Sequence, residues 1–212
     1  MSDKEVNKMN LDETKDVFSN DEYRIEVKPD FGQIPYWIER GYALADRTVQ
    51  VSVSLKKSKV DFAKHIRMNI VYSKEHKEEI RQIARSSFLE DTRFCVTIPP
   101  DEQLIQERIN TYLTDKEQWF LCQYKGRVIG FIVPEIQEEG RVVSVYLAAV
   151  EERYRITGAA MSLYHYVAQY YKELGYEKMV GRISSRNTAV TNVWTSLGAT
   201  FSEPRDIYLL MR

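Results

Sequence analysis

Cysteine and histidine are scarce in this chain of 212 residues, which has two cysteines and three histidines. Cys95 and Cys122 form neither a metal-ligand nor a CxxC spacing, and His65, His76 and His165 are scattered along the chain. We therefore expect no metal site. The low cysteine content fits a reducing compartment.

Long apolar runs and an excess of one charge are also missing. No run of about 18 apolar residues occurs, and the N-terminal sequence MSDKEVNKMNLDETKD lacks the apolar stretch of a signal peptide. The 30 basic and 31 acidic residues leave no overall field that would favour nucleic acid or an anionic membrane surface. We expect a soluble, cytoplasmic protein with neither nucleic acid nor membrane as a partner.

The order of patterns along the chain predicts a main domain preceded by a small lobe. Residues 1–20 are polar and can bury little apolar surface, so we expect a flexible tail. Alternating apolar residues predict strands at 23–27 and 48–55, with a helical turn at 34–40 between them. The polar residues 56–59 separate this N-terminal lobe, residues 21–63, from a domain at 64–212.

Strand-like and helix-like patterns alternate within residues 64–212. Strands are predicted at 66–71, 93–98, 119–124, 128–133, 142–150, 178–183 and 206–211. Helices are predicted at 75–84, 101–113, 160–174 and 188–197. The fold class is therefore α/β (α+β), a mixed sheet with helices on both faces.

The most informative stretch runs from a predicted strand through a polar turn into a helix at Gly158. Unpaired backbone N–H groups and the helix dipole attract anions to a helix start, so a pyrophosphate fits there. Small residues at 158, 159 and 160 allow close approach of the backbone, and Arg155 supplies a charged donor. The alternative is a glycine that only eases the turn between strand and helix.

Residues 155–160 read Arg-Ile-Thr-Gly-Ala-Ala and resemble motif A of the GNAT N-acetyltransferases, Gln/Arg-x-x-Gly-x-Gly/Ala. Residues 186–189 and 197–199 resemble motif B, and the resemblance extends over residues 64–212. It implies a mostly antiparallel central sheet and acetyl-CoA as the co-substrate. The residues that it implies for the pyrophosphate cradle are Arg155, Ile156, Thr157, Gly158, Ala159 and Ala160.

The same resemblance implies further contacts with the cofactor. The backbone N–H of Ala148 would stabilise the oxyanion, Val150 would pair its backbone with the pantetheine arm, and Asn187 would reach the cofactor from motif B. Ordinary strand packing is the alternative for Ala148 and Val150. Asn187 also suits a helix N-cap, a role that overlaps with cofactor binding.

The general acid and base are less clear from the sequence. Trp194 stands where many family members carry a tyrosine, and its indole has no proton that titrates near neutral pH. It would instead stack on substrate, pack against the pantetheine, or serve as a core aromatic. Tyr146 is the candidate base, because strand alternation puts it on the face of Ala148. A water relay or a structural tyrosine is the alternative.

Candidate contacts for the acceptor are Arg93 and Phe94, together with the pair Tyr36 and Trp37. Arginine pairs with phosphate and an aromatic ring stacks on a base or sugar, although packing and surface charge explain the same residues. Residues 41–51, with Arg93 and Phe94, are similar to the bacterial branch that includes TDP-fucosamine acetyltransferase. That branch acetylates a nucleotide-linked amino sugar.

Two functions follow from these residues. The first is an acetyl-CoA-dependent N-acetyltransferase that acts on a small amine, with a nucleotide-linked amino sugar as one acceptor class. The second is a binding or regulatory module that keeps the acyl-CoA cradle with little or no catalysis. Trp194 and the lack of a carboxylate in the predicted strand at 142–150, where related sites can place one, favour the second, and the cradle fits both. The sequence leaves a homodimer open.

Overall fold

The structure of the protein, a computed structural model, describes residues 17–212 except 21, 90, 117, 138 and 140. Residues 1–16 of the expected tail at 1–20 lie outside the described residues. Residues 17–20 form the first strand, β1 (Val17–Asn20).

One sheet of ten strands organises the molecule, in the order β1-β2-β10-β3-β9-β8-β7-β6-β4 with β5 beside β10. The pairs β8–β9 and β5–β10 are parallel and the other pairs are antiparallel, which confirms a mixed, mostly antiparallel sheet. The remaining strands are β2 (Arg24–Val27), β3 (Tyr42–Ser54), β4 (Asn69–Ser73), β5 (Thr97–Ile98), β6 (Trp119–Tyr124), β7 (Arg127–Gln137), β8 (Val142–Val150), β9 (Lys178–Ser184) and β10 (Thr200–Met211).

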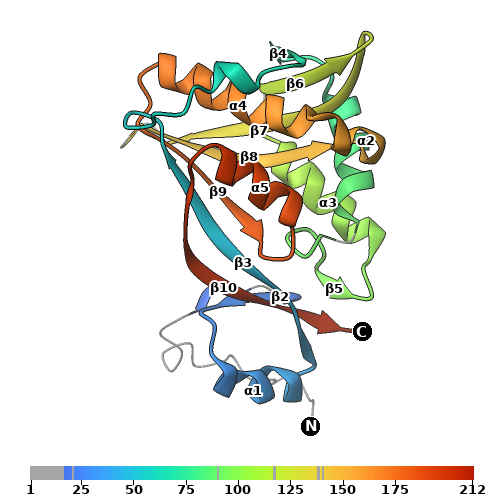
Figure 1. Cartoon of the computed structure of the whole chain (residues 1–212). Coiled ribbons are helices and arrows are strands. Elements are labelled where there is room, and N and C mark those ends of the chain that lie inside the picture. Colours follow the sequence, from blue (N-terminus) through green and yellow to red (C-terminus); the bar gives the residue numbers. More distant parts are fainter. Residues whose placement is uncertain (1–16, 21, 90, 117, 138, 140) are drawn as a thin grey trace.

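Helices cover both faces of this sheet (Figure 1). Apolar side chains of α4 (Ala159–Glu173) and α5 (Thr188–Ser196) share one buried cluster with the sheet. Side chains of α2 (Lys77–Phe88) and α3 (Glu102–Leu113) share a second cluster on the opposite face. Strand alternation supplies both, since Phe120 points into the first cluster and Leu121 into the second. The expected helix-flanked sheet is confirmed.

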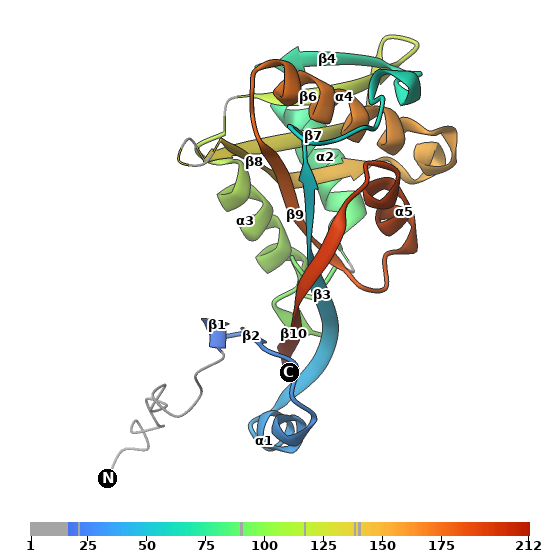
Figure 2. The same cartoon turned by 60° about the vertical axis from the view of Figure 1, so that its left-hand side comes forward.

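The long strands β3 and β10 continue beyond the main body, and β2 and α1 (Ile34–Glu39) lie at their far end (Figures 1 and 2). A small cluster of Ile25, Val27, Trp37 and Tyr208 holds this extension together. Because β3 lies between β10 and β9, the residues assigned to an N-terminal lobe also supply a central strand of the main sheet.

Side-chain hydrogen bonds explain where α3 begins. The Asp101 carboxylate accepts from the N–H groups of Gln103 and Leu104, and α3 starts directly after it.

The expected strand at 93–98 is reduced to the two residues of β5. The reason is a tight turn, in which the N–H of Phe94 donates to the carbonyl of Asp91 at 2.8 Å.

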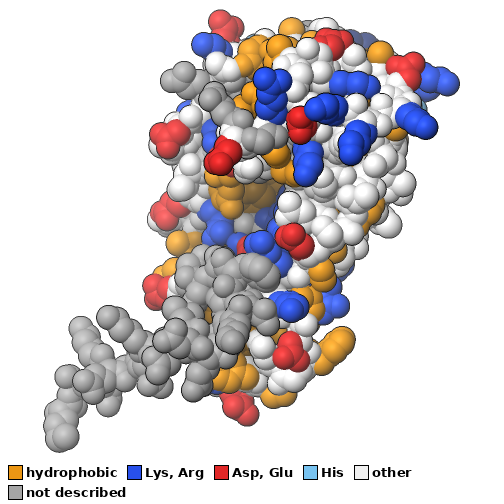
Figure 3. All heavy atoms as spheres, turned by 90° about the vertical axis from the view of Figure 1, so that its left-hand side faces the viewer, with side chains coloured by type: hydrophobic (Ala, Val, Ile, Leu, Met, Phe, Trp, Pro, Cys, Tyr) orange, Lys and Arg blue, Asp and Glu red, His pale blue; other side chains and the backbone are white. Residues whose placement is uncertain are grey.

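The surface seen in Figure 3 carries interspersed charges of both signs, and hydrophobic side chains gather in a hollow near its middle. Among the described residues, no helix combines the length and apolar composition that a membrane crossing requires.

Candidate functional site

Strands β8 and β9 pair along only part of their length. Residues 142–144 lie opposite residues 178–180, and the ladder stops there. Beyond that point β8 stays on β7 up to Val150, while β9 stays on β3 up to Ser184. Each strand follows its outer neighbour, so the two separate and leave an open gap in the sheet.

A cavity of about 470 Å³ occupies this gap. Its walls come from the second half of β8, the start of α4, the middle of β9, and α5, which lies over the gap. The loop between α2 and β5 closes the end on the opposite face of the sheet through Asp91 and Arg93. The cavity therefore passes between the two strands and touches both helical layers.

The backbone of Ala148 faces the gap. The N–H of Glu151 donates to the carbonyl of Ile129 on β7 at 2.9 Å. Antiparallel pairing alternates, so Ala149 and Leu147 also direct their polar groups to β7. Ala148 and Val150 then direct theirs the other way, toward the separated β9, and both residues line the cavity.

Gly158 joins the 3-10 helix η4 (Glu152–Thr157) to α4 in a conformation that favours glycine. Its φ is 81° and ψ is 10°, in the left-handed region where a β-carbon causes strain. The next three N–H groups begin a helix of 15 residues and lack partners within it. The start of α4 therefore presents unpaired N–H groups beside small residues, the arrangement on which the predicted pyrophosphate cradle depends.

The predicted cradle residues separate into two groups. Arg155 lines the cavity, and its Nε donates to the carbonyl of Val150 at 3.2 Å. Ile156 also lines it and is 95 % exposed at the rim, and Gly158 and Ala160 complete this group.

Two cradle side chains point elsewhere. The Thr157 hydroxyl donates to the carbonyl of Tyr154 at 2.7 Å, and the methyl group of Ala159 is buried in the core. If these two residues bind the cofactor, their backbone does so.

Asn187 and Trp194 contribute from α5. The Asn187 side chain accepts from the N–H of Val190 at 3.0 Å, which confirms the N-cap, and the residue also lines the cavity. Trp194 is 1 % exposed and lines the cavity as well. Its Nε1 has no hydrogen-bond partner among the described residues.

Asp91 and Arg93 form a half-buried ion pair at the α2 end of the cavity, with 2.7 Å between Oδ2 and Nη2. Burial alone would raise the pKa of Asp91, but the charge and hydrogen bonds of Arg93 outweigh it and hold that pKa below its usual range. Arg93 Nη1 also donates to the carbonyl of Arg182 on β9 at 3.3 Å. The pair therefore ties the loop to one edge of the gap.

The other predicted acceptor contacts are less accessible. Phe94 is 2 % exposed and stacks on Phe88 with 4.1 Å between ring centroids, so it lies in the core outside the cavity. Trp37 is fully buried in the extension, and the Tyr36 ring lies under the guanidinium of Arg40. A molecule in the cavity can therefore contact Arg93 but cannot contact Phe94 directly.

The expected facing of Tyr146 is wrong, because β8 has a bulge. Val133 pairs with Leu147 but Pro134 pairs with Val145, so Tyr146 has no partner on β7. Val145 and Ala148 consequently both pack toward α4. The Tyr146 ring packs against Tyr112 of α3, with centroids 5.0 Å apart, and lies outside the cavity.

Several residues in the cavity wall were not among the predicted site residues, and three of them are Asp91, Tyr164 and Gly181. Tyr164 had a usable signal, because it follows Ala160 by one helical turn and so shares its face of α4. Asp91 and Gly181 have no such local signal, since only the folding of a distant loop and strand brings them near motif A.

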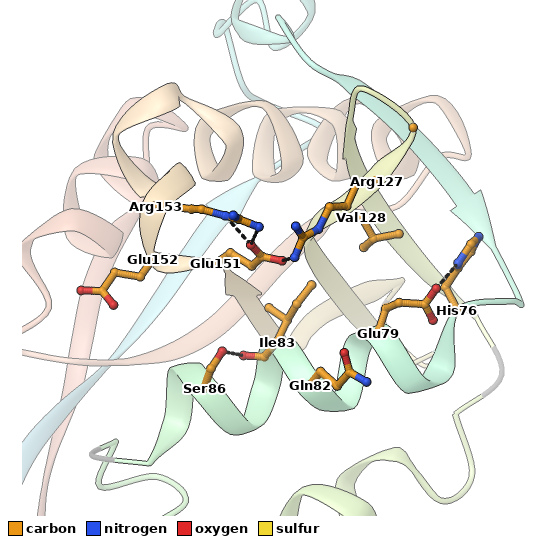
Figure 4. A pocket seen from close by; sticks show the side chains of 11 residues that line it. His76, Glu79, Gln82, Ile83, Ser86, Arg127, Val128, Glu151, Glu152 and Arg153 are labelled. Carbon is orange, nitrogen blue, oxygen red and sulfur yellow. Dashed lines mark hydrogen bonds and ion pairs between the residues drawn. The ribbon is translucent and has the colours of Figure 1, made fainter.

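A second depression, of about 630 Å³, lies between α2 and the turn from β6 to β7 (Figure 4). Its basic side chains are already paired, because Arg127 and Arg153 both reach the Glu151 carboxylate, at 3.0 and 2.9 Å. These two arginines are therefore neutralised within the chain, outside the cavity between β8 and β9.

A model of the acetyltransferase (GNAT) family matches residues 77–199 of the chain. No curated protein matches its sequence. Among solved structures, a GCN5-related N-acetyltransferase from Sphaerobacter thermophilus is similar with a TM-score of 0.58 and 12% identity, over 87% of this chain and 58% of that one. The chain thus spans less than two thirds of that protein.

Two further structures have a similar fold. A GNAT-family acetyltransferase from Novosphingobium aromaticivorans has a TM-score of 0.56 and 13% identity, over 92% of this chain and 77% of that one. The glucosamine N-acetyltransferase region of a fungal GH3 β-N-acetylglucosaminidase has a TM-score of 0.57 and 13% identity, over 86% and 24% of the two chains. At these identities the likeness concerns the fold alone.

Proposed function

Because the chain belongs to the acetyltransferase (GNAT) family, we propose that it transfers the acetyl group of acetyl-CoA to the nitrogen of a small amine. One observation carries the proposal. The separation of β8 and β9 brings the N-terminus of α4 and the open backbone edge of β8 to the same cavity.

The residues around this cavity suit acetyl-CoA. The α4 amides and Arg155 offer donors to a pyrophosphate, beside a glycine and alanines that leave room for it. The exposed Ile156 would lose its contact with water under a bound ligand. The buried, unpaired indole N–H of Trp194 also calls for an acceptor, because an unsatisfied buried donor costs about 1–3 kcal/mol.

Bound acetyl-CoA supplies an acetyl group activated as a thioester. In the proposed reaction the Ala148 N–H donates to the carbonyl oxygen, which gains negative charge as the amine attacks. The Val150 N–H pairs with the pantetheine arm. The α4 amides and Arg155 hold the pyrophosphate and so fix the reacting end in the gap.

The proton of the amine needs a separate route. Tyr146 lies outside the cavity, and Asp91 with its lowered pKa is ionised but weakly basic at neutral pH. We therefore assign the amine proton to water in the cavity. Asp91 would favour a cationic acceptor at the α2 end, and Arg93 would limit this effect by sharing its charge.

The acceptor is proposed as a small amine, with a nucleotide-linked amino sugar as the class to try first. Residues 41–51, which carry that resemblance, form most of the central strand β3. Arg93 lies in the cavity wall beside Asp91, and its guanidinium would pair with a phosphate of the acceptor if that phosphate displaced Asp91. The amino-sugar acetyltransferase among the fold neighbours is a second reason to include glucosamine in the panel.

One residue favours the alternative, an acyl-CoA-binding module without turnover. Trp194 occupies the position at which the family commonly places a tyrosine, and an indole cannot donate a proton to a leaving thiolate. A thiol with a pKa near ~8.5 still leaves tolerably as thiolate, so the enzyme remains our main proposal.

Thermal unfolding with and without acetyl-CoA tests the proposal. At a concentration of about 100 times Kd, binding adds roughly 2.7 kcal/mol, which raises the Tm of a protein of this size by about 5–11 °C. We expect a shift of that order. No shift at millimolar acetyl-CoA would contradict both the enzyme and the acyl-CoA module.

Release of free thiol then separates these two functions. We expect thiol release with at least one amine of a panel that includes nucleotide-linked amino sugars and glucosamine. A clear thermal shift without thiol release from any amine would favour the binding module.

A further inference from the structure

Two aromatic side chains from different helices meet in the wall of the cavity. The rings of Tyr164 on α4 and Trp194 on α5 are edge to face, with centroids 5.5 Å apart and planes at 77°. Both line the cavity, and Tyr164 is only 6 % exposed. They lie where α4 and α5 face each other across the separated strands.

Trp194 fills its position because β9 has a glycine there. A β-carbon built on Gly181 would lie 2.8 Å from Cζ2 of the indole, closer than real contacts allow. The indole therefore packs directly on the β9 backbone. Trp194 therefore forms part of the cavity wall and can donate a hydrogen bond, but its indole has no proton to transfer.

The Tyr164 hydroxyl makes no hydrogen bond with any described residue, and burial raises the pKa of Tyr164 to about 12 against the opposing charge of Arg93. At neutral pH the phenol keeps its proton. The charged groups that face it come from the loop before β5, where Arg93 is paired with Asp91. Burial outweighs the charge of Arg93, so the phenol can act here as a hydrogen-bond donor without losing its proton.

On the premise of acetyl transfer proposed above, we propose that Tyr164 takes the place of the missing tyrosine of α5 and donates a hydrogen bond from its hydroxyl to the departing sulfur. The amine nitrogen bonds to the acetyl carbon, the C–S bond breaks, and its electron pair stays on sulfur. The Tyr164 hydroxyl keeps its proton and stabilises the thiolate through this hydrogen bond. The thiolate then takes up a proton from the water that accepted one from the amine.

Binding of CoA itself tests this hydrogen-bond donor without turnover. A hydroxyl that donates to sulfur stabilises the thiolate, so the thiol of bound CoA should ionise at lower pH in the wild type than in Tyr164→Phe. Thiolate absorbance across a pH series measures this. The matched control is Tyr166→Phe, which removes a hydroxyl from the same helix at a ring that packs against Phe120 outside the cavity, and it should leave the ionisation of the thiol unchanged.

Turnover gives the second readout, with an amine found active in the panel. Tyr164→Phe should lower kcat by about 10²–10³-fold with an unchanged KM for acetyl-CoA, since loss of one hydrogen-bond donor to a developing charge costs about that much. The double variant Tyr164→Phe, Trp194→Tyr returns a phenol to α5 and should recover part of the loss. Wild-type kcat in Tyr164→Phe, or the same thiol ionisation in both proteins, would overturn the proposal.

The failures of the two proposals can be told apart. Absence of any Tm shift with CoA in the wild type would remove acetyl transfer and the Tyr164 role together. If the wild type and Tyr164→Phe bind CoA and turn over equally well, only the role of Tyr164 is removed and acetyl transfer stands. Thermal scans of each variant with and without CoA establish that it folds and binds.

Discussion

The two halves of the β8–β9 pair differ although the same two strands form both. In the closed half, residues 142–144 and 178–180 pair through their backbones, and Val143 and Met179 are fully buried. In the open half the strands separate around small residues such as Ala148 and Gly181, and a cavity takes the place of the ladder.

This difference shows how one strand pair can serve both stability and binding. Closed-half side chains fill the core, so their energy comes from apolar burial. In the open half the helices α4 and α5 bridge the gap through Tyr164 and Trp194, and backbone groups of Ala148 and Val150 are left for a ligand. Substitutions in the closed half should therefore change stability, and those around the open half should change ligand binding.

The largest effect on stability is expected for Met179→Ala in the closed half. Met179 is fully buried in the main cluster, and truncation of such a side chain costs about 2–5 kcal/mol. Urea unfolding measures the loss. Met211→Ala is the control, because Met211 is 56 % exposed and its truncation should change stability by less than about 0.5 kcal/mol. Equal losses for the two variants would refute the claim that the closed half is core.

An intermediate effect is expected for Gly181→Ala, where the open half meets α5. The new methyl group would press on Trp194, and such overpacking costs about 1–3 kcal/mol. Urea unfolding and Trp fluorescence together report the loss and the displaced indole. In the control Gly32→Ala the new methyl group lies 3.3 Å from the Asp30 carboxylate, which can move aside. An unchanged free energy of unfolding for Gly181→Ala would contradict this prediction, because it would mean that Trp194 moves away from the new methyl group without a loss of stability.

The smallest effect on stability is expected for Arg155→Ala at the cradle. Its side chain makes one hydrogen bond to the Val150 carbonyl, so unfolding should change by less than about 0.5 kcal/mol. Acetyl-CoA affinity should fall about 10- to 100-fold, as expected for loss of a charged hydrogen bond worth about 1.5–3 kcal/mol. Calorimetric titration measures the affinity.

Arg153→Ala is the matched control for that substitution. Arg153 lies two residues earlier, and its guanidinium is paired with Glu151 in the second depression, outside the cavity. Its affinity for acetyl-CoA should stay close to that of the wild type. An equal loss in both variants would show that the effect is general positive charge rather than a contact from Arg155.

Local pattern was enough for most elements. The predicted strands at 119–124 and 142–150 coincide with β6 and β8, because continuous apolar runs bounded by polar turns leave little choice of ends. The turn into α4 was predictable for a similar reason. Strand, turn, Gly158 and helix follow one another within a few residues, and the left-handed φ at Gly158 is a demand of that local turn.

The errors arose where distant segments decide the outcome. Alternation predicted Tyr146 on the Ala148 face, but one extra residue in the bulge opposite Val133 and Pro134 turned it toward α3. Phe94 was a candidate contact for the acceptor, with packing as the alternative, and the turn at Asp91 directs it into the core. Neither event leaves a mark in the local period of the sequence.

The sequence by itself determined the family resemblance, the order of strands and helices, and the glycine turn at the start of α4, since each depends on neighbouring residues and on backbone chemistry. Only the tertiary structure decided where β8 and β9 separate, which side chains line the gap, and that Tyr164 of one helix meets Trp194 of another. These contacts join residues far apart in the chain, and their geometry depends on how the whole sheet packs against its helices.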